Sequence, residues 1–357
     1  MELIRPDINI NFVGMRYKAV LASCIIILLG MSVLFWRGGL NMGVDFAGGT
    51  LVQLKFNKAI TPDEIRSLLK DLIGKSTIQQ IGATQDYEFL IRTEAITSEL
   101  QSLSHKIEED LSKTLGERQV SVRRVEMVGP KVGHDLRQKA LFAIYYALLF
   151  IAIYISGRFE FKWAISGIMG GVLVVGIYLL EVVGMNMVSV ICTALVITLV
   201  LCWYLKLPYA LGAVLSLIHD ILITIGFFAL TNKEFTLEVF AALLTLAGYS
   251  LNDTIIVYDR IRENRNKDRR QNFHNLVNTS INETLSRTLL TSSSLMLVLV
   301  CLFFFGGTVI HDFSFAMLIG VVAGTYSSIF VASPLLIFYD DLTKGKRKTK
   351  RERTATA

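Results

Sequence analysis

Apolar blocks of about twenty residues recur along this sequence, and they constrain its fold more than any other feature. A helix of about 20 apolar residues is long enough to cross the hydrocarbon core of a bilayer. Hydrophobic residues make up 52% of the 357 residues and are concentrated in these blocks. We therefore predict a polytopic α-helical membrane protein with eight spans, near residues 18–36, 139–156, 163–181, 188–205, 208–230, 237–258, 286–306 and 315–338.

The distribution of Lys and Arg predicts the orientation of the spans. Basic residues are concentrated at 260–270, after the sixth span, and in the tail 341–357. Because cytoplasmic loops carry the excess of Lys and Arg, we predict that both termini are cytoplasmic. Residues 1–36 then form a cytoplasmic N-terminus and a first span that is retained in the membrane, and residues 37–137 lie outside.

The polar segment 37–137 is predicted to be a separate α+β domain. It holds 14 Lys and Arg and 14 Asp and Glu, and this balance does not favour a nucleic-acid binder. A capping box predicts a helix start at Thr61, and a helical period covers 97–115. Strand-like runs fall at 50–56, 76–81, 87–92 and 119–128. The order β-α-β-β-α-β is that of the ferredoxin-like fold.

Ionisable residues inside the spans are the candidates for chemistry. Such a residue at mid-span costs roughly 2.5–3.5 kcal/mol on insertion scales, so it usually pairs or lines a cavity. Asp253 lies in the sixth span within Gly248-Tyr-Ser-Leu-Asn-Asp-Thr254, with polar Asn252 and Thr254 beside it. It is either an interfacial carboxylate at a bend or a protonatable group in a hydrated pocket, and we favour the second interpretation.

Arg287 belongs to a polar stripe at the start of the seventh span. Thr284, Arg287, Thr288 and Thr291 have the spacing i, i+3, i+4 and i+7, which places them on one helix face. Arg287 is either a positive-inside anchor or a partner of Asp253. We expect the two to lie on facing helices, close enough to interact directly or through water.

His219 and Asp220 form a second polar site, in the middle of the fifth span. Two interpretations remain open: a buried pair that fixes helix packing, or a proton relay, since histidine titrates near neutral pH.

Outside the membrane, Gly43-Val-Asp-Phe-Ala-Gly-Gly-Thr50 follows the first span. Its adjacent Gly48 and Gly49 imply a sharp backbone path. The motif lacks the GK[ST] sequence of a phosphate-binding loop. The four cysteines have neither CxxC nor metal-site spacing, so we expect no disulfide, no metal and no cofactor.

Six motifs in order resemble the SecF subunit of the SecDF complex, a member of the RND superfamily. They cover roughly residues 10–340. They are the glycine motif above, Val128-Gly-Pro-Lys-Val-Gly133, Leu217-Ile-His-Asp220, the Asp253 motif, Tyr258-Asp-Arg-Ile-Arg-Glu-Asn264 and Ser286-Arg-Thr-Leu-Leu-Thr-Ser292.

This resemblance implies a multi-pass protein of the bacterial inner membrane that uses the proton gradient to promote protein export. It implies a SecD-like partner, the SecYEG channel, exported unfolded polypeptides and membrane lipid as surroundings. The family's proton-path carboxylate falls on Asp253 and its arginine on Arg287, with Asn252, Thr254, Thr288, Thr291, His219 and Asp220 in support. The periplasmic-domain motif falls on Gly43, Asp45, Phe46, Gly48 and Gly49.

One departure concerns the number of spans in the membrane bundle, 138–340. The family has six spans in this subunit, and this sequence predicts eight. Removing residues 165–210 joins Phe161-Lys-Trp-Ala164 to Leu211-Gly-Ala-Val214 as an ordinary family sequence. We therefore predict a two-span insertion at 165–210, at the periphery of the bundle.

Three other classes of protein are less consistent with the sequence. An intramembrane aspartyl protease needs two carboxylates that share one site, and the contexts of Asp220 and Asp253 do not match such enzymes, so we expect no enzyme. A stand-alone RND exporter of small molecules or lipids usually carries both half-transporters in one chain. A passive scaffold would leave the cost of Asp253 and Arg287 unexplained. Sodium in place of protons stays open as the coupling ion.

Overall fold

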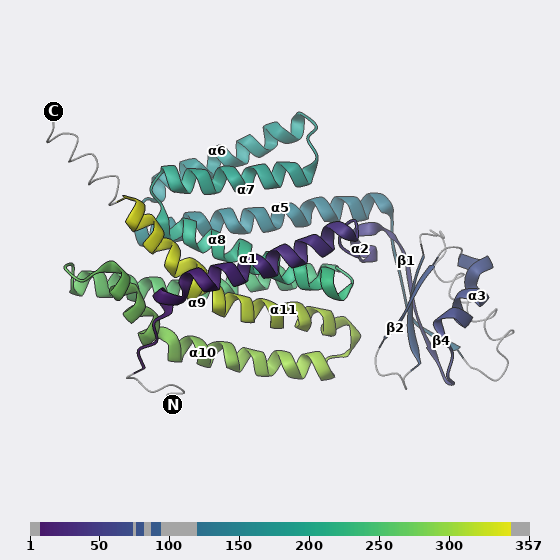
Figure 1. Ribbon diagram of the computed structural model, residues 1–357. Helices are drawn as coiled ribbons and strands as arrows, with labels where there is room; N and C mark the ends of the chain where they lie inside the picture. The colour runs from purple at the N-terminus through teal and green to yellow at the C-terminus, as the bar shows by residue number, and fades with distance from the viewer. Residues whose placement is uncertain (1–7, 74–75, 82–86, 94–119, 344–357) are drawn as a thin grey trace.

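The computed structural model describes residues 8–73, 76–81, 87–93 and 120–343 of the chain. Within these residues, eight helices are long and apolar enough to cross a membrane, which confirms the predicted number of spans. They form one bundle of roughly parallel and antiparallel helices (Figure 1). Their bounds are Phe12–Trp36 (α1), Pro130–Ile155 (α5), Trp163–Val182 (α6), Met187–Tyr204 (α7), Pro208–Thr231 (α8), Leu237–Lys267 (α9), Phe273–Phe305 (α10) and Gly307–Ser327 (α11).

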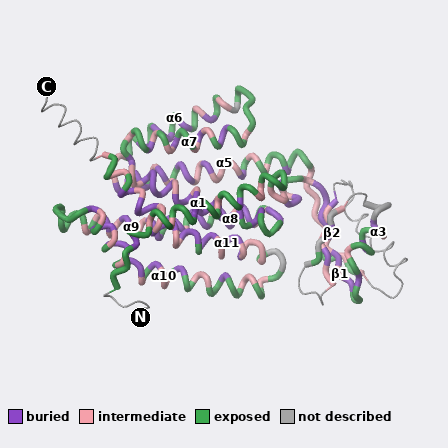
Figure 2. The backbone as a smooth tube through the Cα atoms, viewed as in Figure 1, coloured by how far each residue is buried: buried purple, intermediate pink, exposed green. Residues whose placement is uncertain are grey.

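The centre of the bundle is formed by α8 and α9. In the most apolar window of α8, 67% of the residues are buried, against 11% in α1. Figure 2 shows the exposed segments on outer turns of α1, α6 and α10. Lipid tails are as apolar as leucine, so an exposed apolar face of this kind is typical of a membrane protein.

A close crossing joins α1 to α8. A Cβ atom placed on Gly30 of α1 would lie 2.6 Å from the Cα atom of Gly226 on α8. Small residues at such crossings let two helix backbones approach closely inside a membrane. The two glycines therefore fix α1 directly against the central helix.

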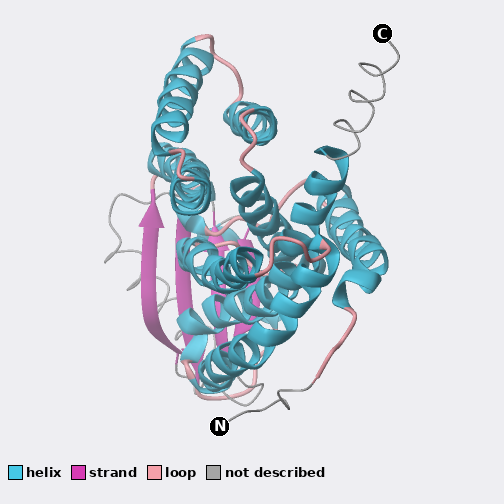
Figure 3. Ribbon diagram, turned by 90° about the vertical axis from the view of Figure 1, so that its left-hand side faces the viewer, coloured by secondary structure: helices cyan, strands magenta, loops and turns pink. Residues whose placement is uncertain are grey.

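A four-stranded antiparallel sheet lies at one end of the bundle, here called the sheet-side end, and the opposite end is called the far end (Figure 1). Figure 3 views the helices from the far end, with the sheet behind them. The strand order is β2-β3-β1-β4. The strands are Gly49–Phe56 (β1), Ser76–Ile81 (β2), Glu88–Thr93 (β3) and Val120–Val128 (β4).

The helix α3, Pro62–Ile73, covers this sheet and starts with the predicted capping box. The Thr61 amide donates to Glu64 Oε2 at 3.2 Å, and the Glu64 amide donates to Thr61 Oγ1 at 3.3 Å. Val52, Leu54 and Phe89 are fully buried in the small core beneath α3. The order and pairing of the strands are those of the ferredoxin-like fold. The second predicted helix, 97–115, lies outside the described residues.

The helices α9 and α10 extend beyond the predicted spans 237–258 and 286–306 and occupy most of the polar segment between them. The helix α9 runs on to Lys267 and α10 already begins at Phe273, so only residues 268–272 form the turn. Ile261, Phe273 and Val277 are buried and hold the two helices together beyond the predicted spans. The apolar stripe formed by these residues is not evident in the sequence, because charged residues on the outer helix faces lower the mean hydropathy of the segment.

Two short π-helices interrupt the bundle and were not predicted. The first, Ser156–Glu160 (η1), follows α5, and the second, Ser328–Ala332 (η2), follows α11. After η2 the chain returns to α-helix as far as residue 343. π-Bulges of this kind shift the register of the residues that follow them.

The hairpin α6–α7 lies at one edge of the bundle, beside α5 and α8 (Figure 1). Ser166 Oγ donates to Ser156 Oγ at 2.6 Å, and Tyr145 Oη lies 3.4 Å from Thr198 Oγ1. At the far end Lys162 Nζ donates to the carbonyl oxygen of Leu205 at 2.9 Å, which caps α7. The hairpin is thus attached through α5, η1 and α8.

Candidate functional site

Asp253 lies on α9 inside the bundle, and only 1% of its surface is exposed. Its Oδ2 accepts a hydrogen bond of 3.2 Å from Ser292 Oγ on α10. Its Oδ1 is buried and has no hydrogen-bond partner within the described part of the chain. The same is true of the neighbouring hydroxyl groups of Thr254 and Thr288. This carboxylate therefore keeps one oxygen available for a proton or a further donor.

Arg287 lies on the exposed side of α10. It lines the same cavity as Asn252, the residue that precedes Asp253 on α9. Among the residues described, however, no carboxylate forms an ion pair with Arg287, and the hydrogen-bond partner of Asp253 is Ser292. The structure thus brings Asp253 and Arg287 near each other without a direct bond.

The threonine stripe around Arg287 divides between two surroundings. Thr284 and Thr288 are buried, whereas Thr291 is exposed like Arg287. Thr284 Oγ1 donates to the carbonyl oxygen of Ser280 at 2.9 Å, and Thr291 Oγ1 donates to that of Thr288 at 3.0 Å. Bonds of this kind satisfy a hydroxyl group within its own helix.

A cavity of about 670 Å³ opens beside these residues, between α5, α9 and α10. Arg287 and Asn252 line it, and so do two ion pairs. In the first pair Arg158 Nη2 lies 2.6 Å from Asp259 Oδ2, and in the second Arg260 Nε lies 2.6 Å from Glu283 Oε2. A polar cavity at this place is large enough to admit several water molecules next to Asn252.

Asp220 of α8 forms the second carboxylate site and is completely buried. His219 Nδ1 lies 2.9 Å from its Oδ1, while Ser250 Oγ of α9 and Ser327 Oγ of α11 donate to its Oδ2 at 2.6 and 2.9 Å. His219 Nε2 lies 3.0 Å from Ser23 Oγ on α1. Both oxygens of Asp220 are therefore occupied, and four helices meet around it.

The helix α11 connects the two carboxylate sites. Its Ser327 donates to Asp220, as described above, and its Thr325 Oγ1 donates to Ser292 Oγ at 2.8 Å. On α9, Ser250 belongs to the Asp220 site and Asp253 lies one turn further along the same helix. A displacement of α9 or α11 would consequently change the surroundings of both carboxylates.

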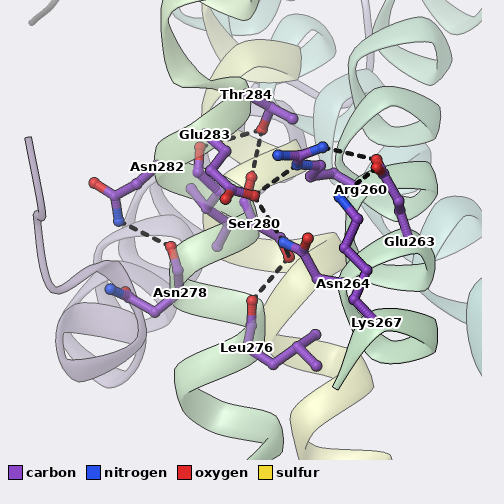
Figure 4. Close-up of polar contacts among 11 residues, drawn as sticks. Arg260, Glu263, Asn264, Lys267, Leu276, Asn278, Ser280, Asn282, Glu283 and Thr284 are labelled. Carbon is purple, nitrogen blue, oxygen red and sulfur yellow. Dashed lines mark hydrogen bonds and ion pairs between the residues drawn. The ribbon is translucent and has the colours of Figure 1, made fainter. Parts of the chain in front are cut away.

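The far ends of α9 and α10 are joined by the polar contacts shown in Figure 4. Glu283 Oε2 accepts hydrogen bonds from Arg260 Nε at 2.6 Å and from Asn264 Nδ2 at 2.7 Å. Asn264 Nδ2 also donates to Ser280 Oγ at 3.0 Å, and Ser280 lies one helical turn before Glu283 on α10. Arg287 lies four positions, about one helical turn, after Glu283, so these contacts fix the part of α10 that carries the arginine.

The glycine motif lies at the sheet-side end and contains a short helix, Val44–Ala47 (α2). Gly48 has a φ of +77°, and a Cβ atom on it would lie 2.8 Å from the Cα atom of Pro130, so only glycine fits this turn. Phe46 is buried against Phe235 and Phe240, with ring centroids 6.0 and 6.4 Å away.

Two further residues of the motif bind the loop between α8 and α9. The Gly43 amide donates to the carbonyl oxygen of Phe235 at 2.9 Å. Asp45 Oδ2 accepts a hydrogen bond of 2.9 Å from the Leu237 amide in the first turn of α9. The motif is therefore a structural junction between the sheet and the bundle.

Sequence reasoning missed several residues of these sites. Ser23, Thr325 and Ser327 are single polar residues in apolar spans, and only the fold shows what they contact. Their common signal is a hydroxyl side chain within a membrane span, which is too frequent to be specific. Within the described ranges, no group of three or more His, Cys, Asp or Glu side chains could hold a metal ion.

Family models describe the chain in two parts. The model of "Protein export membrane protein SecD/SecF, C-terminal" matches residues 107–185 and 180–342. The model of the "SecD/SecF GG Motif" matches residues 33–60, which include the glycine motif.

Individual relatives agree with these models. The protein translocase subunit SecF of Magnetococcus marinus is 40% identical over 97% of each chain, and that of Desulfurispirillum indicum is 40% identical over 92% of this chain and 91% of that protein. The crystal structure of SecDF from Thermus thermophilus, described as a translocon-associated membrane protein, matches 95% of this chain with a TM-score of 0.74 and 30% identity. The match covers 40% of the SecDF chain. This chain belongs to the SecF family of protein translocase subunits.

Proposed function

We propose that this chain couples proton movement to protein export, with Asp253 as the group that takes up and releases the proton. The observation that carries this proposal is the half-satisfied carboxylate: Asp253 is buried, holds one serine and has a free oxygen. A buried carboxylate with the charge of Arg287 nearby has two states of different charge, and each favours a different arrangement of α9 and α10.

The proton gradient supplies enough energy for such a change. One charge that crosses a potential of 100 mV gains about 2.3 kcal/mol, which is sufficient to shift a two-state equilibrium. The cavity lined by Asn252 and Arg287 supports access of water to this region. Thr254 and Thr288, each with a buried hydroxyl group that has no partner in the described ranges, are the groups proposed to exchange hydrogen bonds during the change.

We further propose a SecD-like subunit as the neighbour of the α9–α10 face. Polar side chains on this face point away from the bundle. The hydroxyl groups among them bond within their own helices, but an arginine and an asparagine would be costly against lipid. The polar side chains are Thr245 and Asn252 on α9 and Arg287, Thr291 and Ser294 on α10, all of them exposed. The chain also corresponds to less than half of the SecDF chain, which leaves room for a second half-transporter. The SecYEG channel, exported unfolded polypeptides and membrane lipid complete the proposed surroundings.

The protein is a multi-pass protein of the bacterial inner membrane, and we propose that its far end faces the cytoplasm. The far ends of α9 and α10 carry the basic cluster, which includes Arg260 and Lys267. Both termini are then cytoplasmic and the sheet is periplasmic. A cysteine at Asn57 should react with impermeant maleimide only from the periplasmic side, and labelling from the cytoplasm alone would reverse the orientation.

The proposed domains are the first span (1–36), the periplasmic domain (37–137), the membrane bundle (138–340) and a basic cytoplasmic tail (341–357). Within the bundle we propose that residues 165–210 are an insertion. Its position at the edge of the bundle supports this.

Export into inverted membrane vesicles tests the function. With its SecD-like partner present, Asp253→Asn should lose the increase in export rate that a proton gradient produces, because asparagine cannot exchange a proton. The amount of protein and its co-purification with the partner should stay unchanged. The control is Asp268→Asn, which makes the same change just after the end of α9. A full response to the gradient in Asp253→Asn would exclude Asp253 as the coupling residue.

A further inference from the structure

Three segments that are distant in sequence meet at the sheet-side end of α9. They are residues 41–45 of the glycine motif, the loop 232–236 before α9, and the strand β3 of the external sheet. Two helices, α1 and α5, lead directly into the external domain through the chain. The helix α9 carries Asp253 but has no such covalent continuation, so its connection to the domain depends on non-covalent contacts at this meeting point.

The main chain forms the first part of this connection. Met42 and Phe235 form a parallel β-bridge, and the Phe235 amide donates to the carbonyl oxygen of Asn41 at 2.8 Å. The Asp45 carboxylate accepts from the Leu237 amide, which places a negative charge at the N-terminus of α9. A carboxylate at this end of a helix is stabilised by the helix dipole.

Arg92 of β3 forms the second part. Its guanidinium forms an ion pair with Glu234, a residue that is only 8% exposed. Arg92 Nη1 also donates to the carbonyl oxygen of Met42 at 2.8 Å and to Asn41 Oδ1 at 3.3 Å. One side chain therefore holds the sheet, the glycine motif and the loop before α9 together. The planar guanidinium is suited to this role because it donates in several fixed directions.

The helix α9 can carry a displacement between this point and Asp253. From Leu237 to Asp253 the helix rises about 24 Å, at 1.5 Å for each of 16 residues. The two residues belong to one α-helix without a break. A change at Asp253 that moves α9 would therefore also move Glu234 and pull on Arg92.

We propose that Arg92 is a positioning residue that couples α9 to the external domain. Its ion pair with Glu234 makes the sheet follow the movement of α9. This inference rests on the proposed proton coupling at Asp253, and it identifies the contact through which that coupling reaches the exported chain. The covalent links through α1 and α5 hold the domain at the membrane, whereas Arg92 sets its orientation relative to α9.

Spin-label distances test the positioning role without any export assay. The native cysteines are replaced, and labels are placed at Arg66 on α3 and at Thr231 at the sheet-side end of α8, both exposed. In the purified full-length protein with its partner, the labelled protein that retains Arg92 should give one narrow distribution of distances between the two labels. Arg92→Gln and Glu234→Gln should each broaden or shift it. The matched control is Lys55→Gln, which removes the 3.1 Å ion pair with Glu88 inside the sheet and should change nothing.

Export in inverted vesicles then tests the coupling itself. Arg92→Gln should reduce the gradient-dependent part of the rate about two- to thirtyfold, the range expected for a residue on a coupling route, and leave the rate without a gradient unchanged. Arg92→Lys should recover part of the loss. Unaltered label distances, or a normal gradient response in Arg92→Gln when Asp253→Asn is impaired, would overturn this inference alone. A normal response in Asp253→Asn would overturn the proposed function and the coupling role with it.

Discussion

The two carboxylates of the membrane bundle have different surroundings, although both are packed against α9. Asp220 of α8 contacts Ser250 of α9, and Asp253 lies one helical turn further along α9. Asp220 is completely buried, with His219, Ser250 and Ser327 around both oxygens. Asp253 is equally buried but holds only Ser292. A fully bonded carboxylate joins helices into a fixed arrangement, whereas a half-bonded one can change its partner or its charge at lower cost. We therefore assign the Asp220 site to helix packing and the Asp253 site to the exchange of a proton or of hydrogen-bond partners.

The strongest way to break this comparison is to remove each carboxylate in turn. Asp220→Ala removes the acceptor of three buried polar side chains, and a buried group left without a partner costs about 1–3 kcal/mol. His219 keeps Ser23 and Ser327 keeps the carbonyl oxygen of Gly324, so Ser250 of α9 is the most affected. The melting temperature of the detergent-purified protein should therefore fall sharply. Asp253→Ala leaves only Ser292 without its acceptor and should lower the melting temperature much less. Equal losses in the two variants would show that the Asp253 site also fixes the packing.

A smaller effect is expected from deletion of the hairpin, residues 165–210. The Asp220 site is built from α1, α8, α9 and α11, and the hairpin supplies none of the side chains that bind Asp220. Apolar faces uncovered by the deletion would meet lipid, which costs little. The six-span variant should insert into the membrane and support measurable export.

The control for this deletion is the wild-type chain expressed to the same level. Loss of membrane insertion would show that α8 needs the hairpin to adopt its position. In that case the Asp220 site would depend on packing beyond the helices that contact it.

The sequence was sufficient to predict the spans and the four strands of the described sheet, because both follow from local patterns. Apolar length predicted the eight spans, and Thr61 and Glu64 predicted the start of α3. Periodicity could not predict the two π-helices, because each depends on local packing rather than on a repeat. The continuation of α9 and α10 was missed because charged outer faces lowered the hydropathy of those turns.

The candidate site was only partly predictable. Asp253, Arg287 and Asp220 stood out because charge is rare in a span. Their partners did not, because Ser23, Ser292 and Ser327 come from other helices and hydroxyl groups are common in membrane spans. Arg92 and Glu234 lie 142 residues apart in polar segments, where charged residues are ordinary. Only the fold makes such pairs visible.

The crossing of Gly30 and Gly226 restricts the movement of α1 relative to α8. The two helix backbones are in direct contact here, with no side chains between them whose rearrangement could accommodate sliding. The hydrogen bond between Ser23 and His219 lies two turns away and is a second contact between the same two helices. These two contacts make α1 and α8 one rigid unit. Because Ser250 of α9 donates to Asp220 of α8, a movement of α9 relative to this unit would have to change that hydrogen bond.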